Sequence, residues 1–307
     1  MAMVTPEWVD ALDDIFRTIF NEASDLEAPK LMYDKIFHVI QSNKAFEEDA
    51  AYTGIGLLEE TAELGAVPYE DADPSWTTTY VHREFKKGRM VSKKMWQDEK
   101  WHIIEGLPKT LAQAKLRTFE TASADVFNYG FVVGGGGLAT FDGADGAALF
   151  STAHTNKKGT ITQSNKITTA LSVAALEAVT TSMQNRLDSK GNIVTFNPDT
   201  LIVHPNNRFK ARNILEADGS IGNNFNDINT MKSALNLIVW PYLTNPLAWF
   251  VMDSSAHQLN FFKRTDEGVE GPVWDFDNGA AKWKIETRFS VGYSAWQGIY
   301  GSVGDGS

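Results

Sequence analysis

The chain has 307 residues, no cysteine and a formal net charge of −11 at pH 7. Without cysteine, disulfides, thiolate catalysis and cysteine-ligated zinc or iron–sulfur centres are excluded. A net negative chain is also unlike a general nucleic-acid-binding protein, which presents a basic face. No stretch approaches the roughly 20 apolar residues that a membrane-spanning helix needs, and the first residues lack the pattern of a secretory signal.

Charge is distributed unevenly along the sequence. Residues 1–75 contain 17 acidic and 4 basic residues, whereas residues 76–117 contain 4 acidic and 10 basic residues. Segments of opposite charge can pair within one chain or between neighbouring copies, and they can also be two solvent-exposed faces. The sequence alone leaves these interpretations open.

The first 51 residues are expected to form an N-terminal arm. Apolar residues three or four apart predict an amphipathic helix over residues 6–22 and a second helix over residues 26–40. The apolar stripe of this arm packs either in the chain's own core or on a neighbouring subunit. Three aromatic residues of the stripe are therefore candidate intersubunit contacts: Trp8, Phe16 and Phe20.

Residues 52–91 are expected to form an extended β-hairpin loop. Strand-forming residues flank an acidic, turn-rich segment, and polar residues occupy both faces. A hairpin with so little apolar surface is marginal alone, so another surface must support it. Its second half holds four basic candidates for contacts with acidic residues of a neighbouring subunit or with nucleic acid: Arg83, Lys86, Lys87 and Arg89.

The rest of the sequence predicts an α+β fold without regular βαβ alternation. Residues 92–144 include a long helix from Pro108 to Tyr129, about 30 Å in length. Later elements are a helix capped by Ser172, a buried strand at Thr200–His204 and a strand-rich, aromatic C-terminal segment over residues 261–307.

No motif in the sequence encodes a catalytic, cofactor or metal site. Gly134–Gly137 lacks the following Gly-Lys-Ser/Thr of a phosphate-binding loop and is expected to be a turn. Asp142–Gly146 lacks the closing glutamate of a calcium loop. Ser151 and His154 could serve a hydrolase, but no nucleophile elbow surrounds the serine. We therefore expect a non-enzyme without cofactors.

Several segments of the second half occur in an order and spacing that resembles the Mu-like major head subunit family of tailed-phage capsid proteins. The resemblance covers residues 145–301 well and rests on layout alone before that. The segments that carry it are Leu149–His154, Leu171–Glu177, Pro198–Pro205, Val239–Thr244 with Trp249–Phe250, and Gly292–Gly301.

The resemblance implies the Hong Kong 97 capsid fold. Residues 1–51 would be the N-terminal arm, 52–91 the extended loop and 92–144 the peripheral domain with its spine helix. Residues 145–260 would form the axial domain, and residues 261–307 would return to the peripheral domain. In this family the arm and extended loop reach over neighbouring subunits.

The implied function is self-assembly into hexamers and pentamers of an icosahedral phage head that encloses double-stranded DNA without binding it specifically. The expected location is the virion, after assembly in the host cytoplasm, with a separate scaffold protein and a portal as partners and no membrane. Some relatives crosslink the extended loop to a neighbour, but no crosslink is expected through Lys86 or Lys87. The rival hypotheses are an encapsulin-like nanocompartment shell and a hydrolase.

Overall fold

The computed structural model describes most of the chain, namely residues 5–52, 56–69, 74–97, 106–138, 143–219, 228–277 and 279–305. The chain forms two compact units, each assembled from three separate stretches. Unit 1 comprises Met1–Phe46, Val81–Ser123 and Phe261–Val291. Unit 2 comprises Glu47–Tyr80, Ala124–Asn260 and Gly292–Ser307. Within the described residues, no helix is both long enough and apolar enough to span a membrane.

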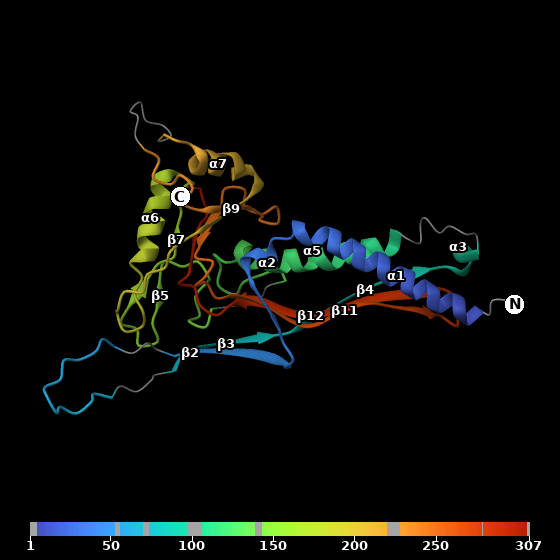
Figure 1. The fold of residues 1–307 in the computed structure, drawn as a ribbon, viewed down its shortest axis with the longest axis horizontal. Helices are drawn as coiled ribbons and strands as arrows, with labels where there is room; N and C mark the ends of the chain where they lie inside the picture. The colour runs from blue at the N-terminus through green and yellow to red at the C-terminus, as the bar shows by residue number, and fades with distance from the viewer. Residues whose placement is uncertain are drawn as a thin grey trace. The chain divides into compact units, whose positions relative to one another are not determined.

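Unit 1 combines a four-stranded sheet, in the order β1-β11-β12-β4, with helices that pack on one of its faces (Figure 1). Strands β11 and β12 and helix α5 continue into unit 2. The elements are α1 (Thr5–Glu27), a 3-10 turn η1 (Ala28–Lys30), α2 (Tyr33–Ile36), β1 (His38–Gln41), β4 (Arg83–Val91), α3 (Lys93–Gln97), α5 (Gly106–Asn128), β11 (Leu259–Trp274) and β12 (Ala281–Tyr293).

The core of unit 1 forms where α1 and α5 cover the sheet. Over its first eight residues, β12 alternates between buried and more exposed positions, as expected for a strand with one covered face. Phe16 of α1 stacks on Trp283 of β12, with ring centroids 4.6 Å apart. Phe16 and Phe20 are only 5% and 2% exposed. These two side chains therefore fill the chain's own core, and neither is available to a neighbouring subunit in this arrangement.

A buried glutamate fixes the N-terminal segment to the long helix α5. Glu120 is 2% exposed, and one of its carboxylate oxygens accepts the backbone N–H groups of Met32 and Tyr33 at 2.5 and 3.0 Å. Tyr33 also packs on a cluster of aromatic rings, which includes Phe119 and Phe261. The helix that was expected over 108–129 is confirmed, and Pro108 sits in its first turn, where proline is tolerated.

Two predictions in the first half of the chain are wrong in detail. The second N-terminal helix, expected over 26–40, is limited to η1 and the four-residue α2, because His38–Gln41 forms an edge strand beside β11. In the segment expected to be one hairpin, β4 pairs antiparallel with β12 in unit 1. The hairpin itself is made by β2 (Phe46–Tyr52) and β3 (Pro74–Val81).

Unit 2 is built around a five-stranded sheet in the order β7-β13-β10-β8-β9. The short strands β5 and β6 form a separate antiparallel pair. The elements are β5 (His154–Thr155), β6 (Thr162–Gln163), β7 (Lys166–Ile167), α6 (Val173–Gln184), β8 (Thr200–Val203), a 3-10 turn η2 (Pro205–Asn207), α7 (Arg208–Glu216), β9 (Asn236–Val239), β10 (Trp249–Met252) and β13 (Ile299–Ser302).

The predicted elements of unit 2 are largely confirmed. Ser172 caps α6, and its hydroxyl accepts the backbone N–H of Ala175 at 3.2 Å. All four residues of β8 are buried, and the apolar residues of α6 and α7 join those of the sheet in one core. Residues 134–137 form the expected turn, with Gly134 and Gly137 at positive φ. At the end of the chain, β13 pairs with β10 and β7, and residues 292–307 belong to unit 2.

Candidate assembly surfaces

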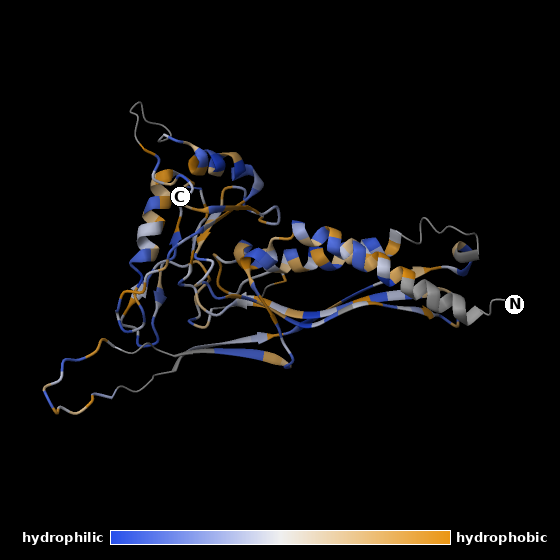
Figure 2. Ribbon diagram, in the orientation of Figure 1, coloured by the Kyte–Doolittle hydropathy of each residue, from blue (hydrophilic) through white to orange (hydrophobic). Residues whose placement is uncertain are grey.

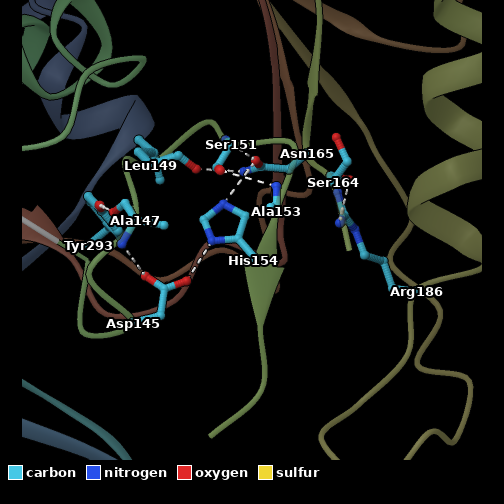
Figure 3. Close-up of polar contacts among 10 residues, drawn as sticks. All are labelled: Asp145, Ala147, Leu149, Ser151, Ala153, His154, Ser164, Asn165, Arg186 and Tyr293. Atoms are coloured by element: carbon cyan, nitrogen blue, oxygen red, sulfur yellow. Dashed lines mark hydrogen bonds and ion pairs between the residues drawn. The ribbon is translucent and has the colours of Figure 1, made fainter. Parts of the chain in front are cut away.

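The two residues of the hydrolase hypothesis are held in a closed hydrogen-bond network (Figure 3). The His154 ring is buried, with Nδ1 2.6 Å from a carboxylate oxygen of Asp145 and Nε2 3.1 Å from the side-chain oxygen of Asn165. Asn165 donates its amide to a backbone carbonyl, which fixes its oxygen toward the ring. The Ser151 hydroxyl accepts the backbone N–H of Ala153. Since both His154 nitrogens face other acceptors, neither can take a proton from Ser151 in this arrangement.

Trp296 contacts both His154 of this network and Arg186. The His154 ring stacks on the indole with centroids 4.2 Å apart, and the guanidinium of Arg186 lies 4.6 Å from the indole ring. Arg186 is 1% exposed and donates to the Ser164 carbonyl, but its Nε and Nη2 have no hydrogen-bond partner among the described residues. Burial lowers the pKa of Arg186 to about 10. This arrangement indicates a structural cluster.

Because burial disfavours its charged form, Arg186 reduces stability at neutral pH, and the penalty lessens only as the pH rises above about 10. Replacing an inadequately paired buried charge by an apolar side chain of similar length is often neutral or stabilising. We expect Arg186→Met to unfold within about 1 kcal/mol of the wild type, or to be more stable. Denaturant unfolding checks this, and a loss of several kcal/mol would show that the ring contacts outweigh the cost of burial.

The same unit contains a cavity of about 370 Å³. Its walls combine aromatic side chains, among them Trp76, Tyr293 and Trp296, with Lys157 and Lys158. No group of three or more acidic or histidine residues suited to a metal ion occurs in the described part of the chain.

The outward face of β4 and β12 carries a ladder of ion pairs. Lys86 lies 3.1 Å from Glu84 and 3.2 Å from Glu286, and Lys284 contacts Glu286 and Glu270. Hydrogen bonds to Glu84 and Glu286 raise the pKa of Lys86. Of the predicted basic contacts, Lys86 is therefore satisfied within its own subunit.

The neighbouring cations of β4 are arranged differently. Lys87 and Arg89 are exposed, lie opposite Ile285 and Trp283 in the β4–β12 register, and form no ion pair with any described residue. Arg83 is exposed as well and lies over the ring of Phe85 at 5.7 Å. Lys87 and Arg89 are the members of the predicted set best placed to bind carboxylates of another molecule. The side chain of Trp8 lies outside the described residues.

The loop between β2 and β3 mixes hydrophobic and hydrophilic residues along its length (Figure 2). Every residue from Leu57 to Tyr69 is exposed. The loop carries three glutamates that form no ion pair with a described residue, Glu59, Glu60 and Glu63. Its large apolar side chains are between 66% and 101% exposed: Leu57, Leu58, Leu64, Val67 and Tyr69. Large apolar side chains gathered in one exposed loop favour an interaction site.

A second apolar surface lies at the turn between β11 and β12, and the sequence did not reveal it. Val273 is 65%, Met90 61% and Phe276 101% exposed. Beside them is a groove of about 360 Å³, whose lining includes Gly88 and Trp283. The signal in the sequence is an aromatic residue, Phe276, inside an Asp-Phe-Asp turn, where polar residues are the norm.

Comparison with known proteins identifies the family. Residues 77–302, well over half of the chain, match the family model described as phage capsid protein. No significantly similar sequence is found among curated proteins.

Solved structures share the fold at low sequence identity. A Microbacterium phage Oxtober96 structure aligns with a TM-score of 0.54 at 13% identity, over 89% of this chain and 90% of that one. The capsid of a native GTA particle aligns with a TM-score of 0.54 at 13% identity, over 87% of each chain. A virus-like particle from Pyrococcus furiosus aligns with a TM-score of 0.54 at 10% identity, over 96% and 99%.

These likenesses confirm the predicted α+β capsid fold, and the virus-like particle gives the nanocompartment alternative no better support than the phage structures. Membership of a capsid family also implies a component of a virion that assembles from many copies of itself. From the family match and the fold together, the chain belongs to the phage capsid protein family and is a major capsid protein with the Hong Kong 97-type fold.

Proposed function

We propose that the chain forms hexamers and pentamers that close into an icosahedral shell around double-stranded DNA, with units 1 and 2 as the peripheral and axial domains. The exposed loop 56–69 is the observation that carries this proposal. Its apolar side chains are exposed in the described part of the chain, and a partner must bury them if they are to contribute to stability. A repeated contact between identical subunits supplies that cover at every position of a closed shell.

Charge supports the same arrangement. The loop offers Glu59, Glu60 and Glu63, while β4 offers Lys87 and Arg89, and none of these forms an ion pair with a described residue of its own chain. Complementary patches on one surface orient incoming subunits and raise their association rate. Acidic residues of the N-terminal region and basic residues of β4 therefore serve as contacts between copies. In this role the chain has no enzymatic activity of its own.

Further partners follow from the same role. A separate scaffold protein would set the size of the shell and a portal would occupy one vertex, and the enclosed DNA would meet no specific binding site. The net charge of −11 favours a shell that does not hold its DNA tightly. No covalent crosslink is needed, and the absence of ladders on a denaturing gel of mature particles is the expected result.

Reversing the charges of Lys87 and Arg89, which form no ion pair with a described residue, tests the proposal. The double variant Lys87→Glu/Arg89→Glu is expected to remain folded and to lose most particle formation, because it places like charges where subunits meet. The matched control is Lys86→Glu, which should disturb the ion-pair ladder within the subunit and leave more assembly intact. Particle yield by sedimentation and subunit folding by circular dichroism are measured together. Normal yield from the double variant would remove these cations from the assembly surface.

A further inference from the structure

The turn between β11 and β12 presents one aromatic side chain on a fixed frame. Asp275 accepts the N–H of Asp277 at 3.1 Å and pairs with Lys282, and the backbone of Asp275 bonds with Gly279 and Ala280. Phe276 is completely exposed at the tip of this turn. Because the turn is held by its own hydrogen bonds, burying Phe276 against a partner costs little conformational freedom.

The groove beside this turn is shaped to receive an apolar side chain. It has a volume of about 360 Å³, and the exposed side chains of Met90 and Val273 supply apolar lining. Gly88 lines it without a side chain, and a Cβ at that position would lie 3.1 Å from the Trp283 carbonyl oxygen. An aromatic side chain buries roughly 150–250 Å² of surface, so its burial in such a groove is favourable. The chain's own Phe276 does not fill the groove, because its side chain is fully exposed.

Charges next to the ring and next to the groove are complementary. Asp277, adjacent to Phe276, is exposed and forms no ion pair with a described residue. On the rim of the groove, Lys282 and Lys284 are paired with Asp275 and Glu270. Arg89, also on the rim, is exposed and has no described ion-pair partner.

We propose that Phe276 of one subunit inserts into the groove beside Met90 and Val273 of a second copy of the chain, where Asp277 pairs with Arg89. Projection and groove lie on the same chain, so the contact can repeat from copy to copy, and repetition by rotation closes a ring. The inference rests on the proposed function, since it assigns one contact of the shell. With Arg89 paired to Asp277, Lys87 is the β4 cation that contacts the acidic loop 56–69 of another subunit.

Removing the ring is the first test. Phe276→Ser should raise the subunit concentration required for assembly at least about tenfold, as expected for a buried aromatic contact. Phe276→Leu should retain part of the assembly, and thermal unfolding of the unassembled subunit should be unchanged in both. The matched control is Phe209→Ser on α7, which removes a 72% exposed phenylalanine elsewhere and should have a smaller effect. Assembly of Phe276→Ser at the wild-type concentration would overturn the contact.

A charge swap tests the pairing directly. Asp277→Arg and Arg89→Asp should each impair assembly, and the double variant should recover to within about threefold of the wild type if the two side chains meet. A double variant as impaired as the single variants would overturn the pair.

A further comparison separates this inference from the proposed function. If Val273→Asp blocks assembly while Phe276→Ser does not, the groove receives another segment, such as loop 56–69, and the inference fails while the proposed function stands. A wild-type chain that never assembles would overturn both.

Discussion

Replacing Trp249 by alanine is expected to lower the free energy of unfolding by about 3–5 kcal/mol, the largest effect of any substitution considered for this chain. Trp249 is 0% exposed and lies in β10, the central strand of the five-stranded sheet. It stands between Val203 of β8 and Ser302 of β13, and its indole N–H donates to the Thr169 carbonyl at 3.0 Å. Alanine would remove the hydrogen bond and leave a cavity in the core of unit 2.

Trp249→Phe separates the two contributions. It keeps most of the ring but removes one of the two donors to the Thr169 carbonyl, which still accepts the Ser302 hydroxyl at 2.7 Å, so a loss of about 1–2 kcal/mol is expected. Denaturant unfolding of the unassembled subunit, followed by circular dichroism, measures both variants. A loss below about 1 kcal/mol for Trp249→Ala would contradict the packing described for this sheet.

Replacing Glu120 by alanine is expected to cost about 2–4 kcal/mol, because it leaves one buried and one partly buried N–H group without their acceptor. These belong to Met32 and Tyr33, which begin the short helix α2. The same carboxylate joins α5 to the segment that follows α1, so faster hydrogen exchange at both amides is also expected.

The control for this variant is Glu120→Gln, which keeps one oxygen in the same position. It should lose about 1–2 kcal/mol, since a neutral acceptor forms weaker hydrogen bonds than a carboxylate. If the hydrogen-exchange rates of the Met32 and Tyr33 amides are unchanged in Glu120→Ala, another group accepts the hydrogen bonds of these amides. The effect on stability is measured by denaturant unfolding at neutral pH.

Local signals in the sequence were sufficient for several elements. Ser172 precedes an apolar periodic run and does cap α6, because the hydroxyl that identifies a cap is the group that accepts the backbone N–H. The continuous apolar run that begins at Thr200 is β8, buried along its whole length. Such features depend on neighbouring residues alone, so one sequence determines them.

Pairings between distant segments could not be predicted in this way. The helix expected over 26–40 ends early because Val39 and Ile40 lie in a strand beside β11, more than two hundred residues away in the sequence. Lys86 and Lys87 look equivalent in the sequence, but their alternation in β4 sends only Lys86 to Glu286. The sequence does not identify Phe276 as an assembly candidate, because only the structure shows that its turn lies beside the groove.

The central claim is that many copies of this chain form a closed shell, and electron microscopy of the purified protein tests it most directly. The account predicts hexameric and pentameric capsomers or icosahedral shells, with double-stranded DNA as the content of particles isolated from infected cells. Shells filled with an enzyme would support the nanocompartment alternative. A protein that remains monomeric at all concentrations, alone and with its scaffold, would contradict the claim.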